Sequence, residues 1–293
     1  MTSQHAELLI NLGSRRSQAV EQQIKDLCQA NCLIIDAYHG VDGSNLDKTL
    51  REIKKRSPKL LIVGSGDGTL SHLVNYFAGS PVVLGIIPLG TTNNFARSLA
   101  LPLEIEPAIK QIADGAIKPI DLGYLKKTYF ANVAGIGISA RIASNINDAK
   151  KRRYGRLAYA LEGLKQFVYH RPFMVNIKDK DGELQLNFET HQVIVANGRY
   201  HAGKEIAVDA TLASRELIIF ALGGRSKFSF MLAMFDFYLG KRKRVKHASY
   251  LIGKYVHIET DMSQPIELDG EVKFKTPCDI SVRAKAIQIK GAA

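Results

Sequence analysis

Apolar positions follow two different periods in the first part of the chain. Short continuous apolar runs, typical of strands buried on both faces, occur at residues 8–12, 33–35, 60–63 and 82–87. Between them lie segments whose apolar residues recur every three or four positions, which is typical of amphipathic helices. These helical positions are Val20, Ile24 and Leu27, then Leu46, Leu50 and Ile53, then Leu70, Leu73, Val74 and Phe77. The alternation predicts an α/β domain with a parallel sheet.

The pattern of apolar and polar residues changes in the second part of the chain. Apolar and polar residues alternate at residues 175–177 and 184–188, with an Asp-Lys-Asp-Gly turn between them, which predicts a hairpin. Further short strands are expected at residues 192–196, 217–221, 256–259 and 280–282, and one helix at 156–169. We therefore predict an antiparallel β domain at 123–283 after an α/β domain at 1–122. Residues 284–293 can return to the first domain.

Length and charge narrow the class of protein. A chain of 293 residues suits two domains, and 40 basic against 28 acidic residues give a net charge of +12. Such a charge favours anionic partners. We expect no nucleic-acid binding, because no recognition helix, ribonucleoprotein motif or zinc module is evident. Three cysteines without metal-ligand spacing favour a reducing compartment, so a cytoplasmic protein without a signal peptide is expected.

Two glycine- and threonine-containing loops follow strands of the predicted parallel sheet. Residues 65–69 read Ser-Gly-Asp-Gly-Thr and residues 90–94 read Gly-Thr-Thr-Asn-Asn. Ligands of parallel sheets bind at the carboxyl ends of the strands, and glycine lets a phosphate approach the backbone closely. Neither loop has the dinucleotide-binding or P-loop spacing. Asp67 is unexpected beside phosphate unless a divalent cation lies between them. The alternative is an ordinary turn with Asp67 as a helix cap.

Taken with motifs further along, these loops resemble the diacylglycerol kinase catalytic-domain family, which includes bacterial lipid kinases and sphingosine kinases. The matching segments occur in the family's order and cover nearly the whole chain: residues 65–69, 84–97, 120–123, 130–137, 196–203 and 268–271. The resemblance implies a nucleotide-binding domain like those of phosphofructokinase and NAD kinase, joined to a β-sandwich. It also implies transfer of a phosphoryl group from ATP, with Mg²⁺, to a lipid hydroxyl.

The resemblance assigns roles to individual residues of this chain. Glu271 would be the general base, and Asp67 would share in catalysis. Asp67 and Asp121 would act through Mg²⁺. The residues implied to bind the nucleotide are Ser65, Gly66, Asp67, Gly68, Thr69, Gly90, Thr91 and Asn93.

The chain departs from the family pattern at several positions. Many relatives carry an aspartate where this chain has Asn94, and an amide cannot supply charge to Mg²⁺. Ser214 and Arg215 stand where bacterial relatives often have an Asp-Gly pair that is linked to a structural Mg²⁺. Two alternatives therefore remain: an NAD kinase-like enzyme, and a catalytically silent nucleotide-dependent protein that binds a membrane or has a regulatory role.

A membrane surface is the expected site of action. Apolar and aromatic residues at 228–235 precede a basic run, Lys-Arg-Lys-Arg, at 241–244, a combination that suits the interface of an anionic membrane. The same segment also suits a helix packed on the β domain and a solvated basic loop. We expect a peripheral protein at the inner membrane surface. The sequence identifies neither the lipid acceptor nor the oligomeric state, so an oligomer stays open.

Overall fold

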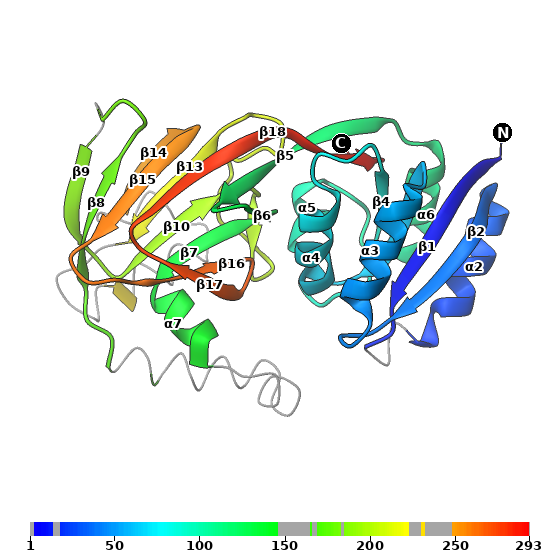
Figure 1. The fold of residues 1–293 in the computed structure, drawn as a ribbon, viewed down its shortest axis with the longest axis horizontal. Helices are drawn as coiled ribbons and strands as arrows, with labels where there is room; N and C mark the ends of the chain where they lie inside the picture. Colours follow the sequence, from blue (N-terminus) through cyan, green and yellow to red (C-terminus); the bar gives the residue numbers. More distant parts are fainter. Residues whose placement is uncertain are drawn as a thin grey trace.

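Two lobes lie side by side in the computed structural model, which describes residues 3–13, 18–145, 165, 169–182, 185–222, 230–231 and 248–292 (Figure 1). The elements of the first lobe are, in chain order, β1 (Gln4–Asn11), α2 (Glu21–Ala30), β2 (Leu33–Val41), α3 (Leu46–Arg56), β3 (Leu60–Ser65), α4 (Asp67–Phe77), β4 (Val83–Pro88), α5 (Asn94–Ser98) and α6 (Ile105–Asp114).

The first lobe is a three-layer α/β unit. Its strands run in the order β2-β1-β3-β4, and each neighbouring pair is parallel. One face of the sheet packs on α3 and α4, through Leu50, Leu73 and Phe77 among others. The other face packs on α2 and α6, through Ile24 and Ile112. The parallel α/β domain predicted from the hydrophobic pattern is confirmed.

The second lobe is a β-sandwich. Its elements are β5 (Ile117–Leu125), β6 (Thr128–Phe130), β7 (Val133–Gly137), α7 (Ile138–Asn145), β8 (Phe173–Lys178), β9 (Gln185–Thr190), β10 (Gln192–Ala196), β11 (Tyr200–His201), β12 (Lys204–Glu205), β13 (Leu217–Leu222), β14 (Ala248–Gly253), β15 (Tyr255–Thr260), β16 (Pro265–Leu268), β17 (Glu271–Lys275) and β18 (Cys278–Lys290).

Two sheets enclose the core of this lobe. One has the order β14-β13-β10-β7-β16-β17, and the other contains β18-β15-β8-β9. Apolar side chains from both sheets form one buried cluster, including Ile136, Val195, Phe173 and Ile258. The hairpin β8–β9 and the strands expected at 192–196, 217–221, 256–259 and 280–282 are all present.

A two-stranded ribbon joins the lobes. The antiparallel strands β5 and β18 run from one lobe into the other (Figure 1). The first part of β18 pairs with β15, whereas Gln288 and Ile289 pair in parallel with Val83 and Leu84 of β4. The last strand therefore belongs to both lobes. The register of β5 against β18 shifts between Arg283 and Ile287.

Some expected segments lie outside the described residues. These are most of the helix expected at 156–169, most of the apolar segment at 228–235 and the basic run at 241–244. Within the described part of the chain, no helix has both the length and the apolar character needed to cross a membrane.

Candidate active site

The two glycine loops meet at the carboxyl ends of β3 and β4. A Cβ atom on Gly90 would lie 2.7 Å from the Cα of Gly66, so this approach requires glycine. Asn93, with a φ of 48°, closes the second loop: its Oδ1 accepts the N–H of Gly90 at 2.8 Å, and its Nδ2 donates to the Gly90 carbonyl at 3.1 Å. By contrast, a Cβ built on Gly68 would have no described atom within 4 Å apart from those of its chain neighbours and of the nearby α4 backbone. The open space beside Gly68, at the N-terminus of α4, suits a phosphate group.

The eight residues predicted to bind nucleotide fall into two groups. Ser65, Thr69 and Asn93 are buried, with exposed fractions of 1%, 6% and 7%. Their side chains therefore support the loops from the interior of the protein. Thr69 Oγ1, for example, accepts the side-chain amide of Asn11 at 2.6 Å. The other residues are partly or fully exposed: Gly66, Asp67, Gly68, Gly90 and Thr91. Only this second group can contact a ligand through exposed atoms.

The Asp67 side chain caps the N-terminus of α5, although Asp67 itself is the first residue of α4. Its Oδ2 accepts Thr92 Oγ1 at 2.8 Å and the N–H of Asn94 at 3.0 Å, and its Oδ1 accepts the N–H of Phe95 at 3.1 Å. The carboxylate thus satisfies the first N–H groups of α5, where a negative charge is favourable. Oδ1 accepts one bond and keeps capacity for a second. Asp67 therefore holds the two loops together and can still contact one further ligand.

Asp121 lies at the register shift of the β5–β18 ribbon. Only 2% of its surface is exposed, and its two oxygens accept the N–H groups of Lys285 and Arg215, each at 2.8 Å. Mg²⁺ requires accessible oxygen ligands in an octahedral arrangement. Across the described ranges, no cluster of three or more His, Cys, Asp and Glu side chains could hold a metal ion. These contacts do not fit a resident Mg²⁺ at Asp121 and indicate a structural role for this predicted ligand.

A metal-removal experiment tests this reading of Asp121. We expect EDTA to leave the thermal unfolding midpoint of the nucleotide-free protein unchanged. Asp121→Asn should lower the midpoint, because an amide replaces one of the two acceptors and leaves a buried N–H unpaired, at a cost of about 1–3 kcal/mol. Differential scanning fluorimetry with and without EDTA measures both effects. A midpoint that falls with EDTA and returns with Mg²⁺ would restore Asp121 as a metal ligand.

A tight turn sets the position of Glu271. Asp269 and Gly270 connect β16 to β17, with φ values of 49° and 93°, as a two-residue type I′ hairpin requires. The Asp269 carboxylate accepts three consecutive backbone N–H groups, those of Ala131, Asn132 and Val133, at 2.7–3.0 Å. Burial raises the pKa of Asp269, the three hydrogen bonds oppose that shift, and the nearby charge of Asp67 raises it further. The turn is thereby anchored at the start of β7.

Glu271 faces α4 of the other lobe. Its Oε1 lies 3.0 Å from Nε2 of His72, and its Oε2 lies 2.8 Å from Nζ of Lys273. The hydrogen bond from His72, with that from Lys273, lowers the pKa of Glu271 to about 2 although partial burial opposes the shift. Glu271 is thus ionised at neutral pH and can accept a proton.

A second contact fixes the same helix against the β-sandwich. The side chain of Asn75 donates to the carbonyl of Tyr129 at 2.9 Å and accepts its N–H at 2.7 Å. The N-terminus of α4 therefore carries the first glycine loop, and its middle holds Glu271. This arrangement brings a candidate phosphate site and a candidate base onto one rigid element.

The hairpin β11–β12 closes the other side of the site. Its Gly203 N–H donates to Oδ1 of Asn94 at 2.8 Å, and the Tyr200 N–H donates to Ser98 Oγ at 3.3 Å. The side chain of Asn94 therefore connects the lobes in this chain. Arg97 brings a positively charged side chain to the second glycine loop, where its Nε donates to the Thr92 carbonyl at 2.9 Å.

His72 and Arg97 were not among the predicted site residues. His72 is 199 positions from Glu271 in the sequence. No local signal reveals that contact. Arg97 lies within the second glycine motif, and a cation one helical turn after a phosphate loop is a recognisable signal.

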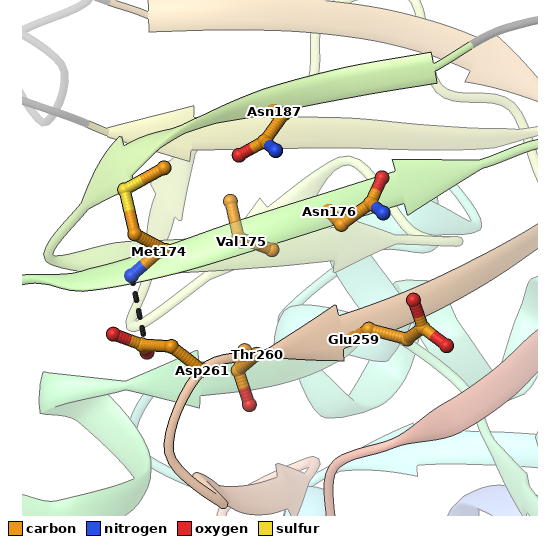
Figure 2. Close-up of a pocket in the computed structure, with 7 residues that line it drawn as sticks. All are labelled: Met174, Val175, Asn176, Asn187, Glu259, Thr260 and Asp261. Atoms are coloured by element: carbon orange, nitrogen blue, oxygen red, sulfur yellow. Dashed lines mark hydrogen bonds between the residues drawn. The ribbon is translucent and has the colours of Figure 1, made fainter.

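A shallow groove of about 230 Å³ lies elsewhere, on β8 and β15 (Figure 2). Figure 2 shows Met174, Asn176, Asn187, Glu259 and Asp261 around it, with the Met174 N–H donating to the Asp261 carboxylate. The strands β8 and β9 lie at the end of the β-sandwich far from the first lobe (Figure 1). The groove therefore has no part in the site at α4.

Comparisons with known proteins agree with this arrangement. The family model described as the diacylglycerol kinase catalytic domain matches residues 5–125, and the YegS C-terminal NAD kinase β-sandwich-like domain matches residues 132–291. A Staphylococcus carnosus protein named "Putative lipid kinase" is 27% identical over 92% of this chain and 89% of its own length. A Bacillus subtilis diacylglycerol kinase is 29% identical over 75% of this chain and 74% of its own length.

The fold is also found among solved structures. A diacylglycerol kinase from Bacillus anthracis superposes with a TM-score of 0.74 at 22% sequence identity, covering 98% of this chain and 96% of that chain. At this level of identity, the likeness shows the fold. It agrees with an α/β lobe joined to an antiparallel β-sandwich.

Proposed function

Because the chain belongs to the diacylglycerol kinase family, with its catalytic domain and its YegS-type β-sandwich domain, we propose that it transfers the γ-phosphoryl group of ATP to a hydroxyl of a membrane lipid. The acceptor would be diacylglycerol, phosphatidylglycerol or a sphingoid-type lipid. The observation that carries the proposal is the contact between Glu271 and α4, since it brings a carboxylate base beside the helix that begins in the glycine loop.

Phosphoryl transfer depends on positioning and on neutralising the phosphate oxygens. Backbone N–H groups at Gly66–Gly68 and at Thr91 and Thr92, together with the charge of Arg97, would bind the phosphates. ATP would arrive as its Mg²⁺ complex, with Asp67 as the loop carboxylate that can contact this ion. The acceptor hydroxyl would bind between this loop and Glu271.

The low pKa of Glu271 is compatible with a general base in this reaction. The acceptor hydroxyl becomes strongly acidic only as its oxygen bonds to phosphorus, so a weakly basic carboxylate suffices at that stage. Asp269 contributes by fixing the turn, and Lys273 by holding one oxygen of Glu271. The resulting geometry leaves little freedom for the carboxylate, which favours catalysis.

A substrate panel tests the proposal. We would incubate the protein with γ-labelled ATP, Mg²⁺ and vesicles that contain diacylglycerol, phosphatidylglycerol, ceramide, a sphingoid base or a polyprenol, with NAD as a soluble acceptor. Label in the lipid phase is expected. Label on NAD alone would assign an NAD kinase-like activity, and bound ATP without transfer to any acceptor would indicate a silent binder.

A further inference from the structure

An extra residue in β17 places Lys273 beside the proposed base. The pairing of β17 passes from Val272 to Phe274 between two consecutive residues of β16, so Lys273 has no partner on that strand. Such bulges turn a side chain out of the regular alternation of a strand and are common next to active sites. Here the Nζ atom of Lys273 lies 2.8 Å from Oε2 of Glu271.

The ammonium group of Lys273 keeps binding capacity beyond this contact. An ammonium has three N–H donors, and the contact with Glu271 uses one of them. The side chain of Lys273 is 39% exposed and that of Glu271 is 38% exposed, so a ligand can reach both groups together. His72 already holds the other oxygen of the carboxylate, with its Nε2 3.0 Å from Oε1. The charge of Lys273 is therefore available to a substrate.

We propose that Lys273 determines which acceptor the protein uses: it binds an anionic group that lies close to the reacting hydroxyl, as in a phosphodiester headgroup with a free hydroxyl. The inference rests on the proposed function and narrows its acceptor class. Among the acceptors named above, phosphatidylglycerol carries such a group, diacylglycerol is neutral, and a sphingoid base carries an ammonium.

The geometry suits contact of one headgroup with both side chains. The acceptor hydroxyl must lie within hydrogen-bond reach of Glu271, about 2.6–3.2 Å, for the base to remove its proton. Each carboxylate oxygen has a further lone pair for this bond. Because Nζ of Lys273 contacts the same carboxylate, it lies within a few atoms' length of the hydroxyl. An anionic group that a few carbon atoms separate from the hydroxyl can therefore reach Nζ.

Charge separates the three kinds of acceptor. Glu271 is ionised, so an anionic group near it would be repelled unless a cation lies between them, and Lys273 provides that cation. A phosphodiester beside Lys273 also gains a charge-assisted hydrogen bond. The ammonium of a sphingoid base would instead lie beside a second ammonium, which is unfavourable. Neutral diacylglycerol has neither effect, so we expect the wild type to prefer phosphatidylglycerol.

Lys273→Gln tests the assignment through a ratio of two activities. The amide keeps N–H donors but removes the charge. We expect kcat/KM for phosphatidylglycerol to fall about tenfold or more relative to kcat/KM for diacylglycerol, the loss expected for one charge-assisted hydrogen bond. Both lipids are presented in uncharged detergent micelles, so the charge of the lipid surface does not contribute. An effect through Glu271 alone would lower both values and leave their ratio unchanged.

Lys275→Gln is the matched control. Lys275 is also exposed and lies on the same strand, four residues from Glu271 and about 13 Å away along the strand. This variant removes the same charge from β17 and should leave the ratio of the two activities at its wild-type value. Lys273→Arg keeps a positive charge at the bulge and should retain most of the preference for phosphatidylglycerol.

The outcomes distinguish the inference from the proposed function. Wild-type protein that phosphorylates no lipid would refute the proposed function. Wild type that uses diacylglycerol but not phosphatidylglycerol, or a Lys273→Gln variant with an unchanged ratio, would refute only the assignment of Lys273. Equal losses for both lipids with a raised KM for ATP would also refute it, and would place the lysine at the nucleotide instead.

Discussion

Glu271→Gln is expected to lower kcat by about 10²- to 10⁴-fold, because it removes the group that accepts the proton of the acceptor hydroxyl. The affinity for ATP should remain close to that of the wild type, since the glycine loops do not depend on this charge. Lys273 and His72 lose a counter-charge, but all three side chains are more than a third exposed, so stability should change by less than about 1 kcal/mol. Steady-state kinetics and calorimetric ATP titration measure the two effects separately.

The chain offers a matched control for this variant. Glu259 also pairs with a lysine and a histidine, Lys178 at 3.3 Å and His257 at 3.2 Å, but it lies on β15 beside the groove of Figure 2. Glu259→Gln breaks ion pairs of the same kind and should leave kcat unchanged. Equal activity of Glu271→Gln and wild type would remove Glu271 from its proposed role.

Two glycine substitutions should separate loop packing from ligand binding. In Gly90→Ala the new Cβ would lie 2.7 Å from both the Gly66 Cα and Asn93 Oδ1, so the loops must move apart, at a cost of about 1–3 kcal/mol. ATP affinity should fall by at least about tenfold as the phosphate site opens. In Gly68→Ala the Cβ meets no described atom and lies in the first turn of a helix, where alanine is favoured.

Gly68→Ala should therefore fold as well as the wild type and still bind ATP more weakly, because its methyl group enters the space proposed for phosphate. Gly43→Ala is the control, since a Cβ there also meets no described atom and the position is an exposed turn between β2 and α3, outside both glycine loops. Thermal unfolding and ATP titration of the three variants give the comparison. Unchanged ATP affinity in Gly68→Ala would exclude the phosphate from this position.

The hydrophobic pattern was sufficient for most of the fold. Continuous apolar runs identified β1, β3 and β4, because strands buried on both faces carry apolar residues at every position. The Asp-Gly pair of residues 269–270 is typical of a two-residue turn, and in the structure both residues have positive φ. The expected helix at 156–169 lies almost entirely outside the described residues.

Contacts between residues far apart in the chain could not be predicted from the sequence. The resemblance identified Asp67 and Asp121 as acids that would act through Mg²⁺. It did not indicate which backbone N–H groups donate hydrogen bonds to their carboxylate oxygens. Those donors come from Asn94, Phe95, Arg215 and Lys285, and only the assembled fold brings them together. The contact of His72 with Glu271 could not be predicted for the same reason, since nothing local in either segment depends on it.

The ribbon of β5 and β18 has a consequence for how the chain is made. In the cell the first lobe emerges from the ribosome early, yet Val83 and Leu84 of its sheet await Gln288 and Ile289 of β18. Until then, β4 has an unpaired edge, which is a hazard for association with other nascent chains. The first lobe can complete its sheet only after β18 has been synthesised, so the proposed binding of ATP should be acquired only once the β-sandwich has followed the first lobe from the ribosome.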